Sequence, residues 1–105
     1  MSRSSTCSPD RFKPRGLHLL DEPEAALSAR GCLYAVRRIH ELCRAGAQFL
    51  IATNSPILPA VPDARILEIR ADGTLTPASY DDALPVRTMR RFLADPAATV
   101  RQLLG

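Results

Sequence analysis

The chain has 105 residues, of which 46% are hydrophobic and 24% charged, and its formal net charge is +3. These values predict at most one ordinary globular domain with a modest core. The basic excess is small and scattered, because 14 Lys and Arg residues face 11 Asp and Glu residues. No basic stripe is interleaved with aromatic residues, so nucleic-acid binding is disfavoured and remains a third hypothesis.

The three cysteines, Cys7, Cys32 and Cys43, do not have the spacing of metal ligands. Cys32 and Cys43 would lie about 16 Å apart along one helix, which is too far for a disulfide. An odd number of unpaired thiols is typical of a reducing compartment. No apolar run reaches the ~18 residues that a membrane span needs, and the first residues lack the apolar core of a signal peptide. We therefore expect a cytoplasmic protein.

The first half of the chain predicts a strand, a helix and a second strand. Residues 1–16 are polar and rich in turn formers, which predicts a loose leader. The apolar run 17–20 predicts a buried strand. Ser28 is a good N-cap for a helix over 29–45, which Gly46 would end. With a second strand over 47–53, the pattern is a βαβ unit with parallel strands.

The predicted helix carries an apolar stripe at helical spacing, which should face the core. The stripe consists of Cys32, Val36, Ile39 and Cys43, flanked by Leu33 and Leu42. Three charged residues, Arg37, Glu41 and Arg44, share the opposite face. This arrangement predicts that one side of the helix packs on the strands.

The second half predicts shorter elements separated by turn-forming residues. They are a helical turn over 57–60, a strand over 65–69, a hairpin turn at Asp72-Gly73, a short strand over 74–76, and helices over 86–94 and 97–104. Ser55-Pro56 and Asp95-Pro96 each supply an N-cap followed by a proline at the first helical position. We divide the chain into the leader 1–16, a central region 17–79 and a helical tail 80–105.

Two adjacent acids, Asp21 and Glu22, directly follow the first predicted strand. Acids at the C-terminal edge of a buried strand build ligand crevices in doubly wound α/β proteins. Asp21 suits the Mg²⁺ of a nucleotide, which keeps several waters and takes one or two carboxylates. Glu22 points elsewhere and could orient or deprotonate an attacking water. Alternatively, both acids and Glu24 only favour the positive end of a nearby helix; spacing alone does not separate these interpretations.

Two segments carry a family resemblance. Leu17-His18-Leu19-Leu20-Asp21-Glu22 resembles the Walker B strand of ABC-type ATPases of the P-loop, AAA-type class, and residues 23–28 stand where that family has its D-loop. Phe49-Leu50-Ile51-Ala52-Thr53-Asn54-Ser55-Pro56 is similar to the following strand and switch loop. The chain from Gly16 onward resembles the C-terminal half of bacterial soluble ABC-class ATPases. The resemblance implies an α/β fold: a partial P-loop NTPase sheet with a parallel βαβ core, a short β-ribbon and C-terminal helices.

The resemblance also implies ATP binding and Mg²⁺-dependent ATP hydrolysis. It places Asp21 on the metal, Glu22 as general base and Ser28 near the nucleotide. Asn54 stands where the family has a His that contacts the γ-phosphate; an Asn side chain can donate a hydrogen bond there but carries no charge. The alternative is that Asn54 is simply a strand-to-turn residue that tolerates left-handed backbone geometry.

The phosphate-binding segments of this family are missing from the sequence. There is no Gly-x-x-x-x-Gly-Lys-Ser/Thr motif (Walker A), since the one lysine, Lys13, lacks the glycines, and no Leu-Ser-Gly-Gly-like signature. We therefore expect the isolated chain to be inactive, with ATP and Mg²⁺ bound only in a complete site. The alternative function is a non-catalytic interaction module that docks on a complete ATPase chain. A free strand edge would favour a homodimer or association with a P-loop-containing chain.

Other polar residues favour structural roles. His18 lies on the first strand and is expected to pack rather than to bind a ligand, and His40 borders the helix core. No acid–base partner follows Ser55 at a recognisable spacing, so it is expected to cap a helix rather than act as a nucleophile. Three arginines, Arg87, Arg90 and Arg91, are expected to form a solvated helix face.

Overall fold

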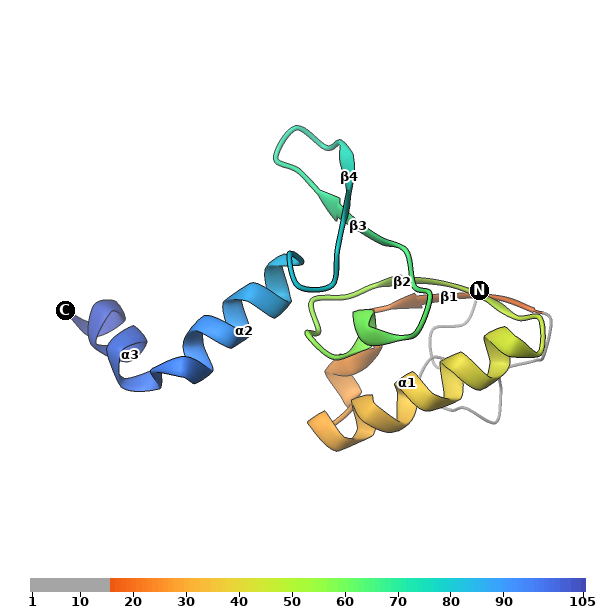
Figure 1. Cartoon of the computed structure of the whole chain (residues 1–105), viewed down its shortest axis with the longest axis horizontal. Coiled ribbons are helices and arrows are strands. Elements are labelled where there is room, and N and C mark those ends of the chain that lie inside the picture. Colours follow the sequence, from red (N-terminus) through yellow and green to blue (C-terminus); the bar gives the residue numbers. More distant parts are fainter. Residues whose placement is uncertain (1–15) are drawn as a thin grey trace. The chain divides into compact units, whose positions relative to one another are not determined.

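A computed structural model describes residues 16–105, which belong to two compact units that divide between Ala64 and Arg65 (Figure 1). The rest of the predicted leader, with Cys7 and Lys13, lies outside the described residues. The first unit contains β1 (Leu17–Asp21), η3 (Pro23–Ala26), α1 (Ala29–Arg44), β2 (Gln48–Ala52) and η4 (Leu58–Ala60). The second contains β3 (Ile66–Ile69), β4 (Leu75–Ala78), α2 (Leu84–Ala94) and α3 (Pro96–Leu104).

The predicted βαβ unit is confirmed, and the fold belongs to the mixed α/β class. β1 and β2 pair in parallel, with Leu17 opposite Gln48 and Asp21 opposite Ala52, and α1 connects them. At the start of α1, the Ser28 hydroxyl oxygen accepts a hydrogen bond from the Gly31 N–H at 3.0 Å, which confirms the predicted N-cap.

The end of α1 is a Schellman motif, in which a left-handed residue reverses the chain. Gly46 has φ 106°, a region open to glycine at no steric cost, and its N–H donates to the Cys43 carbonyl. The Ala47 N–H donates to the Leu42 carbonyl at 2.9 Å. The predicted glycine stop is therefore confirmed, and it sends the chain back into β2.

The core of the first unit lies between α1 and one face of the β1–β2 sheet. Leu20, Leu42 and Ala47 are buried together, and Phe49 and Ile51 pack against them. His18 stacks on Phe49 with ring centroids 4.9 Å apart, which agrees with its predicted packing role.

The opposite face of the sheet is exposed, so the prediction of a buried first strand is wrong for this face. Leu17, Leu19 and Leu50 are 66%, 40% and 66% exposed. The burial of β1 alternates along the strand because only one side of it meets α1.

The apolar stripe of α1 also differs from the prediction at its C-terminal end. Cys32 and Ile39 are buried as expected, but Cys43 is exposed and Leu42 is buried in its place. The reason is the Schellman motif, which brings the residue after the glycine, Ala47, back against the last helical turn at Leu42. Cys32 and Cys43 are not joined by a disulfide, as predicted.

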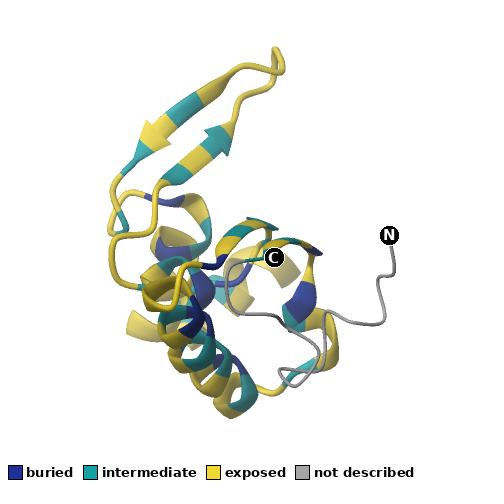
Figure 2. Ribbon diagram, turned by 90° about the vertical axis from the view of Figure 1, so that its right-hand side faces the viewer, coloured by how far each residue is buried: buried dark blue, intermediate teal, exposed yellow. Residues whose placement is uncertain are grey.

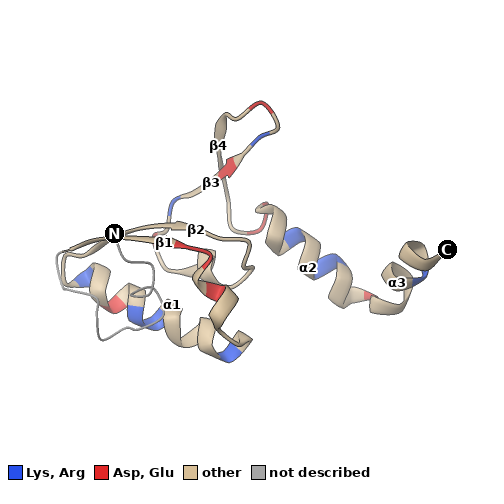
Figure 3. Cartoon of the chain, turned by 180° about the vertical axis from the view of Figure 1, so that it is seen from behind, with Lys and Arg blue, Asp and Glu red and all other residues tan. Residues whose placement is uncertain are grey.

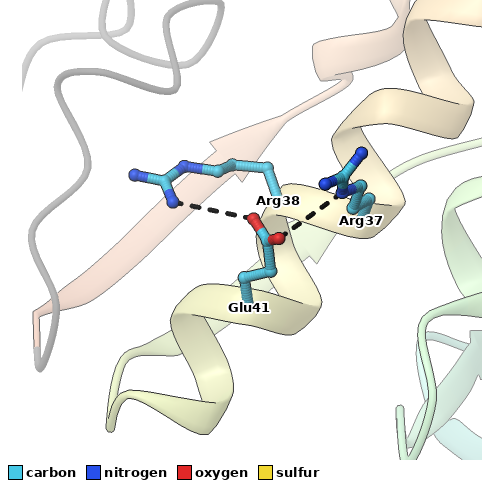
Figure 4. Close-up of polar contacts among 3 residues, drawn as sticks. All are labelled: Arg37, Arg38 and Glu41. Carbon is cyan, nitrogen blue, oxygen red and sulfur yellow. Dashed lines mark hydrogen bonds and ion pairs between the residues drawn. The ribbon is translucent and has the colours of Figure 1, made fainter.

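The outer face of α1 carries the predicted charged residues. Figure 4 shows the Glu41 carboxylate between two arginines, with Arg37 Nε at 3.4 Å and Arg38 Nη1 at 3.8 Å. Exposed pairs of this kind contribute at most about 1 kcal/mol to stability. Glu41 is therefore a suitable control position for substitutions of other acids.

In the second unit, β3 and β4 form a separate antiparallel hairpin, and exposed and half-buried residues alternate along both strands (Figure 2). The turn is at the predicted Asp72-Gly73: Gly73 has φ 88° and its N–H donates to the Arg70 carbonyl at 2.8 Å. Asp72 Oδ1 accepts from the Thr74 hydroxyl at 2.7 Å, and this hydrogen bond lowers the pKa of the Asp72 carboxyl. The last strand begins one residue later and ends two residues later than predicted.

The two C-terminal helices follow the prediction with one shift. α2 begins at Leu84, two residues before the predicted start, because the Glu68 carboxylate of β3 accepts the Leu84 N–H at 2.6 Å. α3 begins at Pro96, and Asp95 Oδ1 accepts the Ala98 N–H at 3.1 Å, which confirms the predicted cap. Among residues 16–105, no helix has the length and hydropathy required to cross a bilayer.

Candidate functional site

The two adjacent acids lie at the C-terminal edge of the parallel sheet. Asp21 is the last residue of β1 and lies opposite Ala52, the last residue of β2. The Glu22 N–H donates to the Ala52 carbonyl at 2.7 Å, so the strand pairing continues one residue further. Figure 3 shows acidic residues in red where β1 ends and η3 begins. The loop 53–55 leaves β2 at this same edge, so the two segments of the family resemblance are neighbours in space.

Glu22 has a left-handed backbone conformation, with φ 46° and ψ 54°. For a residue with a side chain, this conformation costs roughly 1–2 kcal/mol, and such strain is concentrated at functional sites. Asp21 and Glu22 are both exposed, and within residues 16–105 neither carboxylate forms an ion pair or accepts a hydrogen bond. Both carboxylates are therefore available to a ligand.

Glu24 behaves differently, because its carboxylate is committed to the loop after β2. The Thr53 hydroxyl donates to Glu24 Oε1 at 2.6 Å, and the Asn54 N–H donates to Glu24 Oε2 at 3.0 Å. The Thr53 hydroxyl oxygen in turn accepts the Ser55 N–H at 3.0 Å. We call the contacts of Glu24 with Thr53 and the Asn54 N–H the Glu24 bridge. Sequence reasoning missed it, since a partner 30 residues away leaves no local signal.

The remaining predicted residues divide into two groups. Asn54 lies at the same sheet edge as Asp21 and Glu22 and is exposed, so its side chain is accessible there. Ser55 is buried, and its hydroxyl oxygen accepts the N–H groups of Ile57 and Leu58 at 3.0 and 3.2 Å. The Ser55 hydroxyl therefore holds the turn that leads into η4, but the N-cap of η4 itself is Ile57, so the prediction of Ser55 as the helix N-cap is correct only for the preceding turn. Ser28 caps α1, and no described hydrogen bond links it to Asp21 or Glu22.

A protein contributes only one or two of the ligands of a nucleotide-bound Mg²⁺ ion, and the candidate site can supply one of them. In the described part of the chain, no three His, Cys, Asp or Glu residues are grouped to hold a metal ion. Mg²⁺ bound to a nucleotide needs only one or two carboxylates, since phosphate oxygens and waters complete its coordination. Asp21 provides one exposed carboxylate at the sheet edge, which fits this requirement.

A scan of the chain against protein-family models finds no match, and a search of curated protein sequences finds no relative.

Proposed function

We propose that this chain provides the Walker B, D-loop and switch segments of an ABC-class ATPase of the P-loop type, whose phosphate-binding segments lie outside these 105 residues. One observation carries the proposal: Asp21 and Glu22 are exposed and free of side-chain partners within residues 16–105, at the C-terminal edge of a parallel βαβ unit. This edge is where α/β proteins bind their ligands. Asn54, on the neighbouring loop, stands at the position of the switch residue.

In this proposal each residue has a distinct role in the hydrolysis of Mg-ATP. Asp21 binds the Mg²⁺, which neutralises charge on the phosphates. Glu22 accepts a proton from the attacking water while the water oxygen bonds to the γ-phosphorus and the bond to ADP breaks. Asn54 donates a side-chain hydrogen bond to a γ-phosphate oxygen. The Ser28 hydroxyl oxygen accepts the hydrogen bond that caps α1, so the hydroxyl hydrogen is still able to donate a hydrogen bond to the nucleotide.

The proposal is tested by supplying the missing segments. We use the term Walker A half for a polypeptide that contains the Walker A motif and the signature segment of a soluble ABC-class ATPase and that ends before the Walker B strand of that ATPase. The isolated chain is expected to show no Mg-ATP turnover above background, because it has no phosphate cradle. Co-expression with the Walker A half is expected to give a complex that hydrolyses ATP. Turnover by the isolated chain that disappears in Glu22→Gln would contradict the proposal.

A second candidate function is a non-catalytic interaction module. The observation that favours it is the exposed apolar face formed by Leu17, Leu19 and Leu50, because parallel sheets are normally covered on both faces. If this face docks on the Walker A half, Leu50→Glu is expected to abolish co-purification of the two polypeptides. The Leu33→Glu variant on exposed α1 surface is the matched control. Light scattering that shows a stable monomer without affinity for the Walker A half would rule out this function.

A further inference from the structure

We propose that Glu24 is a positioning residue: the Glu24 bridge holds the loop after β2 against the segment that carries Glu22, and so sets the backbone of the proposed catalytic base. The catalytic part of this inference rests on the proposed ATPase function. The structural part, that one carboxylate ties two loops together, stands independently of it.

Both oxygens of the Glu24 carboxylate take part in the bridge. Oε1 accepts the Thr53 hydroxyl at 2.6 Å and Oε2 accepts the Asn54 N–H at 3.0 Å. Hydrogen bonds to an ionised acceptor are shorter and stronger than neutral ones, and 2.6 Å is in the range of the short O–H···O⁻ type. Because Glu24 is half-buried and both its oxygens are engaged, its role is to fix other groups rather than to bind the nucleotide.

The bridge closes a ring that includes Glu22. The ring runs from the Glu22 N–H to the Ala52 carbonyl at 2.7 Å, along the chain to Thr53, across to Glu24, and back through Pro23 to Glu22. Next to the ring, the Ala25 N–H donates to the Glu22 carbonyl at 3.0 Å. The left-handed conformation of Glu22 is unfavourable by itself, so it persists only where surrounding contacts impose it. The Glu24 bridge is the side-chain contact that supplies this constraint.

The inference is tested on the full chain, without nucleotide, by NMR amide exchange and backbone chemical shifts. In Glu24→Ala, exchange of the Asn54 amide is expected to accelerate on the order of 10- to 100-fold, because its charged acceptor is gone. The Ala47 amide, which donates to Leu42 in the core, reports global opening, so the Asn54 amide should accelerate more than the Ala47 amide does. The Cα and Hα shifts of Glu22 are expected to move. Glu41→Ala, which removes only exposed ion pairs, is the matched control and should change none of these values.

Variants of Thr53 keep the test informative if Glu24→Ala does not fold. Thr53→Val keeps the side-chain shape but removes the hydroxyl, so the Ser55 amide loses its acceptor and should exchange faster. Thr53→Ser restores the hydroxyl and should return both the Ser55 exchange rate and the Glu22 shifts to the native values. Unchanged Asn54 exchange in Glu24→Ala, or unchanged Glu22 shifts in both Glu24→Ala and Thr53→Val, would overturn the inference.

The catalytic part is measured separately in the complex with the Walker A half. Glu24→Ala is expected to lower kcat on the order of 10- to 100-fold with little change in the KM for ATP, since displacement of a reacting group impairs chemistry more than binding. A raised KM with unchanged kcat would overturn the positioning role. If the native complex has no turnover but the exchange results are as expected, the ATPase proposal fails and the Glu24 bridge stands. If Asn54 amide exchange is the same in Glu24→Ala as in the native chain, the proposed role of the Glu24 bridge is wrong, whatever turnover is measured.

Discussion

Replacing Glu22 with Gln is expected to lower the kcat of the complex between this chain and the Walker A half by about 10²- to 10⁴-fold, the range typical for loss of a general base. Gln keeps the size of the side chain and can still hydrogen-bond to water, but it cannot accept the proton. Affinity for Mg-ATP should stay within a few-fold of native, because Asp21 and the phosphate-binding segments are unchanged. Steady-state turnover and nucleotide titration measure the two quantities.

A second substitution separates chemistry from stability at this position. Glu22→Gly removes the carboxylate and also removes the steric cost of the left-handed backbone, roughly 1–2 kcal/mol, against an entropic cost of about 0.4–1 kcal/mol in the unfolded chain. We therefore expect Glu22→Gly to be at least as stable as the native chain to urea, yet as inactive as Glu22→Gln. Glu41→Gln should keep full turnover. Native turnover in Glu22→Gln would show that Glu22 is not the base.

The Leu42→Ala substitution is expected to destabilise the first unit by about 2–5 kcal/mol, the usual cost of emptying a buried leucine site. Leu42 is 3% exposed and is buried with Leu20 and Ala47 between α1 and the sheet. A small domain has little stability in reserve, so this loss should unfold a large fraction of the molecules. Urea titration followed by far-UV circular dichroism, with amide exchange at Ala47, measures the change.

The matched control for this prediction is Leu33→Ala on the same helix. Leu33 is 60% exposed, so its truncation should change the free energy of unfolding by less than about 0.5 kcal/mol. Cys43→Ala should also have a small effect, since Cys43 is exposed although its helical spacing predicts burial. Equal losses of unfolding free energy in Leu42→Ala and Leu33→Ala would mean that the core does not lie on the face of α1 that carries Leu42.

Much of the fold is readable from the sequence, because short-range hydrogen bonds decide it. Ser28, Gly46 and Asp95 mark helix ends through contacts with residues at most four positions away along the chain. The Asp72-Gly73 turn is equally local. The parallel pairing of β1 and β2 also follows, since a helix between two strands reverses the chain twice and leaves them pointing the same way.

Local sequence patterns are enough to predict the βαβ unit, the helix-end residues Ser28, Gly46 and Asp95, and the position of Asp21 and Glu22 at the end of β1. Three features follow instead from how distant segments pack: Glu24 accepts hydrogen bonds from Thr53 and Asn54, Leu42 is buried instead of Cys43, and one face of the sheet is exposed. Each of these depends on which distant segment comes to lie beside a residue. Periodicity and spacing in the sequence indicate which residues are close to each other along the chain. The hydrogen-bond partner of a carboxylate and the burial of a leucine depend instead on which distant segments pack together.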